Sequence, residues 1–107
     1  MIVTAPSPAW TVYAHIAPNG KMYVGITGMD PEVRWRNGKG YRKNIYFDRA
    51  IQKYGWENFE HQIIASGLTK EEAGNCERLL IEKLDLMNKD KGYNQTSGGE
   101  TAVCGAL

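Results

Sequence analysis

Three side chains that can bind a phosphate or move a proton lie close together near the N-terminus: Tyr13, His15 and Tyr23. They belong to two runs between residues 11 and 26 in which apolar residues alternate with polar or aromatic ones. This period of two is typical of strands with one buried face. In a hairpin of the two runs Gly25 lies opposite Tyr13, and a glycine there leaves space above the sheet. We therefore expect room for a ligand, although tyrosine and histidine are also common on half-exposed strands without such a role.

Glu77 also stands out, because it lies in a run with the period of an amphipathic helix. At about 100° per residue, Ala73, Leu80 and Leu84 share one face, and Glu77 falls inside it. A lone buried carboxylate costs several kcal/mol unless it is paired, protonated or bound to a metal. Glu77 is therefore expected at the open rim of a sheet, in a salt bridge with an arginine such as Arg34, or in a functional site.

The basic residues gather in the middle of the chain. Between positions 34 and 53 seven lysines and arginines stand against one acid, Asp48, whereas the rest of the chain has six basic and eleven acidic residues. Aromatic residues lie between these central charges, which suits the binding of a polyanion. The plainer alternative is a solvated helix face.

Length and composition exclude several classes of protein. With 107 residues, 42% hydrophobic and 23% charged, the chain has the size and composition of one globular domain. No apolar run approaches the roughly 18 residues of a membrane span, and residues 1–10 lack the pattern of a signal peptide. Cys76 and Cys104 are too few for a disulfide framework and lack zinc-ligand spacing with the two histidines. We therefore expect a reducing, cytoplasmic setting.

The apolar pattern of the two N-terminal runs predicts a three-residue turn, Pro18-Asn19-Gly20. In this register Val12 faces Ile26 and Ala14 faces Val24, so that one face of the hairpin is wholly apolar. A two-residue turn would mix apolar and polar residues on each face. Proline at the first turn position and glycine at the last also suit the longer turn.

The remaining elements are predicted from their ends. Asp30 followed by Pro31 is typical of a helix start, and Thr69 with Glu72 three residues later forms a capping box. The signals predict helices over 30–38, 45–54 and 69–86, a loop at 38–40, a strand over 60–65 and a polar closing loop over 92–99. This order predicts an α+β fold in which helices flank a small three-stranded antiparallel sheet, made of the N-terminal hairpin and one later strand.

On these residues the chain resembles the GIY-YIG nuclease family. Five landmarks carry the resemblance, in the family's order, over residues 11–99. They are Thr11-Val12-Tyr13, Tyr23-Val24-Gly25, Arg34-Trp35, Glu77 ahead of Leu80-Ile81, and Gly92-Tyr93-Asn94 followed by Gly98-Gly99. Each landmark alone is weak, whereas the ordered set is specific. Residues 34–59 look most like the phage and mobile-element branch, which is homing-endonuclease-like.

The chain departs from the family pattern at two places. Thr11 and Val12 replace the leading glycine and isoleucine of the first motif, in which only the tyrosine is chemically demanding. Many members carry a histidine four residues after the helix arginine, where this chain has Gly38. Its task would fall to another group such as His15, which leaves open whether Tyr13 or His15 is the base.

The resemblance implies a metal-dependent DNA endonuclease that hydrolyses phosphodiester bonds. The implied catalytic residues are Tyr13, Tyr23, Arg34, Glu77, Asn94 and His15, and the implied DNA contacts are Lys39, Tyr41, Arg42 and Lys43. Glu77 would bind Mg²⁺ or Mn²⁺ together with waters and a phosphate oxygen. The alternatives are a catalytically inactive nucleic-acid-binding module of the same fold, and a small interaction domain unrelated to nucleic acid.

The implied organisation is an N-terminal extension at 1–10, a nuclease domain at 11–99 and a C-terminal tail at 100–107. The expected partner is DNA. Family members usually carry a separate DNA-recognition region, so the alternatives are a stand-alone nuclease of low specificity, a fragment of a longer protein, or a nuclease that works with a separate DNA-recognition domain or protein. The protein would act inside a cell, including the host cell of a phage. Trp35, Trp56 and Phe59 are expected in the core.

Overall fold

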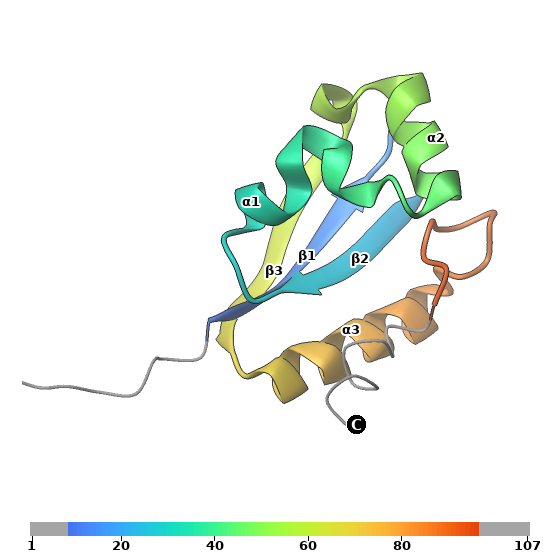
Figure 1. The fold of residues 1–107 in the computed structure, drawn as a ribbon. Coiled ribbons are helices and arrows are strands. Elements are labelled where there is room, and N and C mark those ends of the chain that lie inside the picture. The colour runs from blue at the N-terminus through green and yellow to red at the C-terminus, as the bar shows by residue number, and fades with distance from the viewer. Residues whose placement is uncertain (1–8, 97–107) are drawn as a thin grey trace, which may run out of the picture.

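The protein folds as a three-stranded antiparallel sheet with helices on both faces (Figure 1). The structure is a computed structural model that describes residues 9–96. In chain order the elements are β1 (Trp10–Ile16), β2 (Met22–Thr27), α1 (Pro31–Trp35), the 3₁₀ helix η1 (Arg36–Tyr41), α2 (Ile45–Tyr54), the 3₁₀ helix η2 (Trp56–Asn58), β3 (Glu60–Leu68) and α3 (Lys70–Leu84). The predicted α+β class is confirmed. The predicted Gly98-Gly99 motif, the tail and most of the N-terminal extension lie outside the described residues.

The central strand is β1, with β2 on one side and β3 on the other. The hairpin has the predicted register, in which Val12 lies opposite Ile26. The Ala17 N–H donates to the Lys21 carbonyl at 2.9 Å and closes a three-residue turn. Gly20 has φ of 87° in this turn, a value that favours glycine. The predicted turn is therefore confirmed.

The third strand, β3, runs three residues past the predicted end at Ala65. It was predicted too short because Ser66 and Gly67 are residue types that favour turns. The register between β1 and β3 shifts near Val12, and beyond this irregularity His15 lies opposite His61. The pairing therefore brings the two histidines of the chain together.

The first helix begins where predicted, because the Asp30 carboxylate accepts a hydrogen bond from the Glu32 N–H at 2.9 Å. It ends at Trp35 rather than at Gly38. Three successive residues from Arg36 onward have left-handed φ, of 50°, 54° and 88°, and an α-helix cannot continue through them. Of the residues predicted as a loop, 38–40, Gly38 has non-helical backbone angles at a kink within η1, and Lys39 and Gly40 lie in the 3₁₀ turn after it.

The two later helices are held by caps at their first residues. α2 covers the predicted residues 45–54 and is capped by the side chain of Asn44. The predicted capping box of α3 is present: the Glu72 N–H donates to Thr69 Oγ1 at 3.0 Å, and the Thr69 N–H donates to Glu72 Oε1 at 2.9 Å. α3 ends at Leu84, two residues earlier than predicted, because Asp85 is left-handed with φ of 56°. Within residues 9–96 no helix is both long and apolar enough to cross a membrane.

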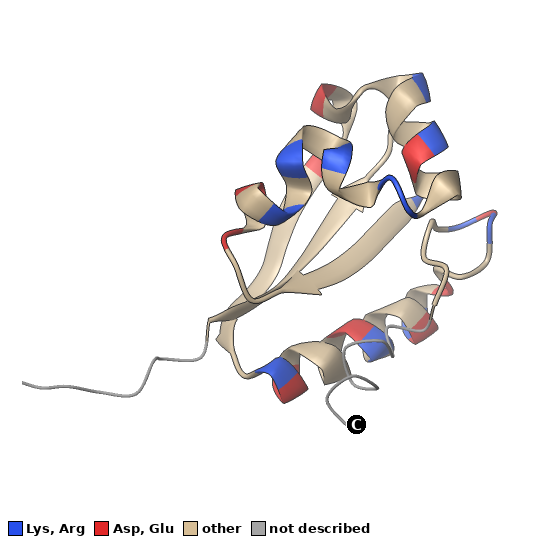
Figure 2. Cartoon of the chain, viewed as in Figure 1, with Lys and Arg blue, Asp and Glu red and all other residues tan. Residues whose placement is uncertain are grey.

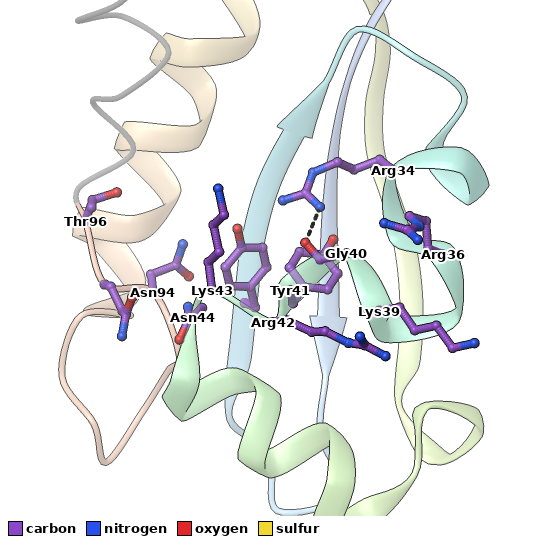
Figure 3. Close-up of a pocket in the computed structure, with 12 residues that line it drawn as sticks. Arg34, Arg36, Lys39, Gly40, Tyr41, Arg42, Lys43, Asn44, Asn94 and Thr96 are labelled. Carbon is purple, nitrogen blue, oxygen red and sulfur yellow. Dashed lines mark hydrogen bonds between the residues drawn. The ribbon is translucent and has the colours of Figure 1, made fainter.

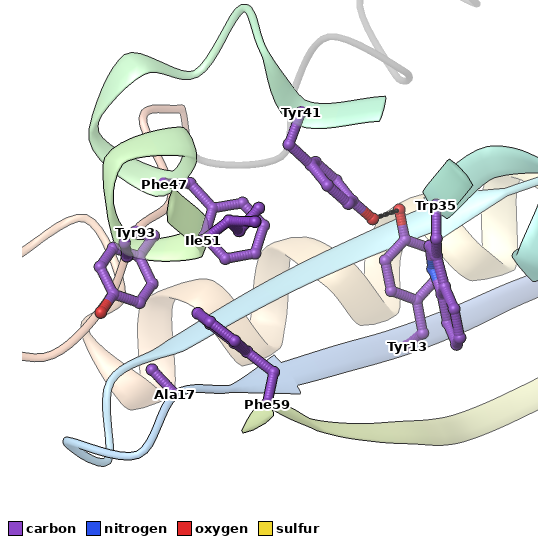
Figure 4. Packing of buried hydrophobic residues seen from close by; sticks show 9 residues of the cluster. Tyr13, Ala17, Trp35, Tyr41, Phe47, Ile51, Phe59 and Tyr93 are labelled. Atoms are coloured by element: carbon purple, nitrogen blue, oxygen red, sulfur yellow. Dashed lines mark hydrogen bonds between the residues drawn. The ribbon is translucent and has the colours of Figure 1, made fainter. Parts of the chain in front are cut away.

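Each face of the sheet has its own core. The face under α1 and α2 is aromatic, with Tyr13, Ala17, Trp35, Tyr41, Phe47, Ala50, Ile51, Phe59 and Tyr93 (Figure 4). The face under α3 is aliphatic, with Val12, Ala14, Val24, Ala73, Ile81 and Leu86. Trp35 and Phe59 are buried as predicted, and Trp56 is partly buried against the aromatic core. The aromatic core is the platform on which the predicted site residues lie.

Candidate active site

An open hollow of about 560 Å³ lies on the α1–α2 side of the sheet (Figure 3). It is lined by Tyr23, Arg34, Arg36, Lys39, Gly40, Tyr41, Arg42, Lys43, Asn44, Asn94, Gln95 and Thr96. Seven of the ten predicted site residues are among these. The other three, Tyr13, His15 and Glu77, are buried outside the lining.

The hollow is strongly basic. Five of its lining residues are lysine or arginine and none is acidic. None of the five forms an ion pair with another residue in the part of the chain that the structure describes. Figure 2 shows Lys and Arg clustered on η1 and the turn before α2, while α1, α2 and α3 each carry both signs. The surface can therefore hold a polyanion without first breaking internal ion pairs.

Arg34 projects from the last turn of α1 into the hollow. Its Nη1 donates to the Gly40 carbonyl at 2.7 Å, and its guanidinium lies 4.5 Å from the centre of the Tyr41 ring. A carbonyl and an aromatic face hold the guanidinium in place while leaving most of its five N–H groups for a ligand. Arg34 is thus held in one orientation, in a form suited to an anion.

Tyr13 lies across Gly25, as the hairpin register predicts. A Cβ placed on Gly25 would come within 2.7 Å of the Tyr13 hydroxyl oxygen. The glycine therefore makes room for the tyrosine itself. The expectation of ligand space above Gly25 is wrong, because Tyr13 fills that space and has 0% of its surface exposed.

The Tyr13 hydroxyl lies 3.0 Å from the hydroxyl of Tyr41. Burial raises the pKa of the Tyr13 phenol above its usual value of 10. The charge of Arg34 opposes this rise, and the charge of Glu77 adds to it. Tyr13 is therefore a neutral phenol near pH 7, within electrostatic reach of both the predicted phosphate-binding arginine and the predicted metal ligand.

His15 is buried in the aromatic core, with 0% of its surface exposed. Its Nδ1 lies 2.9 Å from Nδ1 of His61, and its Nε2 lies 2.8 Å from the Tyr41 hydroxyl. Burial, together with the nearby His61 and Arg34, lowers the pKa of His15 from 6.5 to about 2. His15 is therefore neutral near pH 7 and supplies no positive charge that would help Tyr13 to ionise.

Tyr23 and Asn94 lie on the side of the hollow near β2. The Tyr23 ring stacks on Phe47 with ring centres 4.7 Å apart. Asn94 is buried and binds one backbone residue twice: its side-chain oxygen accepts from the Val24 N–H at 3.0 Å, and its amide donates to the Val24 carbonyl at 2.9 Å. Asn94 therefore holds the outer edge of β2, the strand that carries Tyr23 and Gly25.

Glu77 is buried in α3, with 3% of its surface exposed, as its place on the apolar helix face predicts. No group of three or more His, Cys, Asp or Glu side chains among residues 9–96 could hold a metal ion. A single carboxylate does not fit Zn²⁺, which takes three or four protein ligands. It does fit Mg²⁺, which keeps several waters and binds through one or two carboxylates plus substrate phosphates.

Sequence reasoning missed two parts of this arrangement. Arg36 and Asn44 line the hollow but were not predicted as site residues. Arg36 belongs to the basic run that the sequence shows, whereas nothing in the sequence indicates Asn44. His61 was not predicted as a partner of His15, because that pairing depends on β3 lying next to β1. The order of three strands is not readable from their separate patterns.

Two comparisons with known proteins give a match, and a third gives none. The family model described as "GIY-YIG catalytic domain" matches residues 9–94. The protein named "Putative endonuclease segD" from Enterobacteria phage T4 is 33% identical over 81 residues, which is 76% of this chain and 34% of that protein. The chain thus spans about a third of the length of this relative. No solved structure matches the chain to a significant degree.

Proposed function

The chain belongs to the GIY-YIG family, and we propose that it is a metal-dependent DNA endonuclease acting inside a cell. The observation that carries this proposal is the basic hollow, with Arg34 on its wall and the Tyr13–Tyr41 pair beneath it. A DNA backbone presents a regular row of negative charges, which such a surface attracts. The family match supports hydrolysis over binding alone.

Arg34 would bind the scissile phosphate. Its planar guanidinium presents paired N–H groups that match two phosphate oxygens, which a lysine cannot do. The other cations of the hollow, Lys39, Arg42 and Lys43 among them, would hold neighbouring phosphates. Contacts of this kind position DNA without specifying its sequence.

Glu77 would hold one Mg²⁺ or Mn²⁺ ion, with waters and phosphate oxygens as the other ligands. When bound, such an ion stabilises the negative charge on the phosphate and on the leaving 3′ oxygen. A buried carboxylate suits this task, because its low-dielectric surroundings strengthen its attraction for a cation.

We assign the base to Tyr13 rather than to His15. Both ring nitrogens of His15 already contact protein groups, and its surface is fully buried, so no water can reach it directly. Tyr13 is also buried, but its hydroxyl contacts that of Tyr41, which lines the hollow, and lies within electrostatic reach of Arg34. Because Tyr13 has 0% of its surface exposed, a water would reach its hydroxyl only after the side chains that bury it shift.

The proposal is tested by nicking of a supercoiled plasmid with Mg²⁺ or Mn²⁺, with and without a chelator. Wild-type protein should cut with metal and stop with chelator. Glu77→Gln, which keeps the size of the side chain, should cut at least 100-fold more slowly while its unfolding midpoint and DNA affinity stay close to those of the wild type.

The control is Glu82→Gln, which removes a charge from the exposed side of α3 and should leave cleavage unchanged. Cutting by Glu77→Gln at the wild-type rate would contradict the role of Glu77. Binding of DNA without any metal-dependent cutting by the wild-type protein would instead support the inactive binding module.

Selective cutting would need more than this surface. Phosphate contacts carry no sequence information, so we propose that a separate DNA-recognition domain or protein selects the target. The expected result is that residues 1–107 alone cut plasmid DNA at many positions. Cleavage at one position on a long DNA would contradict this.

A further inference from the structure

Four side chains form a continuous hydrogen-bonded chain beneath the hollow. The hydroxyl oxygens of Tyr13 and Tyr41 lie 3.0 Å apart (Figure 4). The Tyr41 oxygen lies 2.8 Å from His15 Nε2, and His15 Nδ1 lies 2.9 Å from His61 Nδ1. The chain ends at the Trp56 carbonyl, 3.1 Å from His61 Nε2. It therefore runs from the site, through the aromatic core, to the edge strand β3.

With both histidines neutral, as their lowered pKa values indicate near pH 7, the last contact fixes the direction of all the others. A carbonyl oxygen only accepts, so His61 Nε2 carries a hydrogen, and the Nδ1 of a neutral His61 carries none. His15 must then donate through its Nδ1, which leaves a lone pair on its Nε2. That lone pair accepts the hydroxyl hydrogen of Tyr41. Because Tyr41 has only one hydrogen, Tyr13 is the donor in the remaining contact.

Both histidines are neutral in this arrangement. Two ring nitrogens 2.9 Å apart share one proton, so the two rings are not both charged. The His15 ring lies 4.8 Å from Trp35 and 4.6 Å from Trp56, between ring centres, in a setting that disfavours charge. Burial lowers the pKa of His61 as well, and the nearby Glu32 opposes that effect.

The direction of the chain decides what Tyr13 can do. Its hydrogen points into the protein, so a lone pair of its oxygen can accept a hydrogen bond from a water once the side chains that bury it admit one. Burial raises the pKa of Tyr13 and disfavours a phenolate. Tyr13 can therefore take a proton from water only if it gives up its own hydrogen in the same step.

We propose that Tyr41, His15 and His61 form a proton relay that lets Tyr13 act as the base, an inference that rests on the proposed nuclease function. The attacking water bonds to phosphorus and gives one proton to the Tyr13 oxygen. The hydrogen of Tyr13 moves to Tyr41, and that of Tyr41 moves to His15 Nε2. The Nδ1 hydrogen of His15 moves to His61 Nδ1, which becomes a cation. The leaving oxygen takes a proton from solvent, and the reverse shift later returns one proton to water.

His61 is the member of the relay best placed to hold the charge. It is half-buried at the sheet edge, whereas His15 has 0% of its surface exposed. Its Nε2 hydrogen bond to Trp56 remains when Nδ1 is protonated, and the negative charge of Glu32 favours the cation. A relay ending at His61 therefore moves the positive charge from the core toward water.

The direction of the relay is tested without any cleavage assay. The chain has two histidines, so ¹⁵N NMR of protein labelled at histidine gives one pattern for each ring. The expected result near pH 7 is His15 protonated at Nδ1 and His61 protonated at Nε2. The opposite tautomers would overturn the relay whatever the activity of the protein.

The transfer of the proton is tested by His61→Asn. Its amide oxygen can accept the His15 hydrogen bond but cannot take the proton. The single-turnover cleavage rate should fall about 100-fold, with DNA affinity near that of the wild type. Tyr41→Phe, which interrupts the relay, should cause a similar loss, and the double variant should lose no more than either alone. Gln62→Asn, next to His61 and exposed, is the control and should cut normally.

The outcomes separate the relay from the nuclease function. Wild-type cleavage by His61→Asn would overturn the relay and leave the endonuclease proposal standing. If the double variant lost rate by the product of the two single losses, His61→Asn and Tyr41→Phe would act through two independent structural effects. That result would also overturn the relay. Absence of metal-dependent cutting by the wild-type protein would overturn the proposed function, and the relay with it.

Discussion

Gly25 and Tyr13 act as a pair across the hairpin. The tyrosine ring covers the glycine, and its hydroxyl lies where a Cβ of any other residue would be. This overlap brings the hydroxyl to Tyr41. The absence of a side chain at position 25 thus positions the oxygen that we propose as the base.

Gly25→Ala should disturb the site more than the fold. The new Cβ would lie 2.7 Å from the Tyr13 oxygen, so the ring must move away from Tyr41. We expect a loss of about 1–3 kcal/mol of stability from overpacking, measured by urea unfolding, and at least a tenfold loss of cleavage rate, measured by plasmid nicking.

The control is Gly74→Ala in α3, where an added Cβ meets nothing within 4 Å. It should stabilise the helix by about 0.5–1 kcal/mol and leave cleavage unchanged. An active Gly25→Ala protein would show that the Tyr13 position is not critical.

His15 should make stability depend on pH. Its pKa is about 2 in the folded chain against 6.5 for the free side chain, so below pH 6.5 the unfolded chain binds a proton that the folded chain does not. The contribution of neutral His15 to the free energy of unfolding is therefore complete above pH 7, and it decreases as the pH is lowered below 6.5. His15 alone should remove about 2 kcal/mol between pH 7 and pH 5, measured by urea unfolding, and His61 adds a loss of the same sign. His15→Gln should flatten the dependence, and an unchanged slope in this variant would contradict the assignment.

For single residues, the sequence predicted the helix face or strand register of a side chain better than it predicted what covers that side chain. The helix period placed Glu77 on a buried face, and the hairpin register placed Gly25 opposite Tyr13. Both follow from local periodicity. The burial of Tyr13 and His15 does not, because it depends on α1, η1 and α2 covering that face of the sheet.

At the level of elements, β2 is an edge strand whose outer side is closed by the segment after α3. The Tyr93 N–H donates to the Met22 carbonyl at 2.9 Å. Two residues further along β2, the side chain of Asn94 pairs with both backbone groups of Val24, as a neighbouring strand would. The segment therefore fixes the strand that carries Tyr23.

Asn94→Ala should loosen this edge. It leaves the buried N–H and carbonyl of Val24 without partners, and each unsatisfied group costs about 1–3 kcal/mol. We expect a loss of at least 2 kcal/mol by thermal or urea unfolding, with cleavage reduced because Tyr23 and Gly25 shift. Gln95→Ala, at the exposed neighbouring position, should keep full stability. Equal stability of Asn94→Ala and wild type, with activity lost, would favour direct contact of Asn94 with the substrate.

Element boundaries were predictable where a cap defines them. Asp30 and Thr69 accept the hydrogen bonds that their sequence context predicts. The end of α1 was not predictable, because the non-glycine residues Arg36 and Asn37 adopt left-handed φ. That conformation is costly and has no sequence signal of its own. It turns the chain into η1, which carries Lys39 and Tyr41 to the hollow.

At the scale of the whole molecule, a net charge of +1 conceals a separation of charge. The α1–α2 side carries the basic hollow, and the α3 side carries both signs (Figure 2). The sequence predicted the basic run, and the fold gathers it on one surface. Long-range attraction of DNA should therefore act on one side of the sheet only, which orients the domain as it binds.

This orientation predicts how binding responds to salt. Each phosphate contact contributes about −0.9 to the slope of log K against log salt concentration. The double variant Lys39→Gln, Lys43→Gln should therefore reduce the slope by about 2, measured by fluorescence anisotropy with a labelled duplex in the presence of chelator, so that no cutting occurs. The matched control is Lys70→Gln, Lys83→Gln on α3, which removes the same charge from the other side of the sheet and should leave the slope unchanged. Equal changes in both double variants would mean that net charge alone, rather than the basic hollow, attracts DNA.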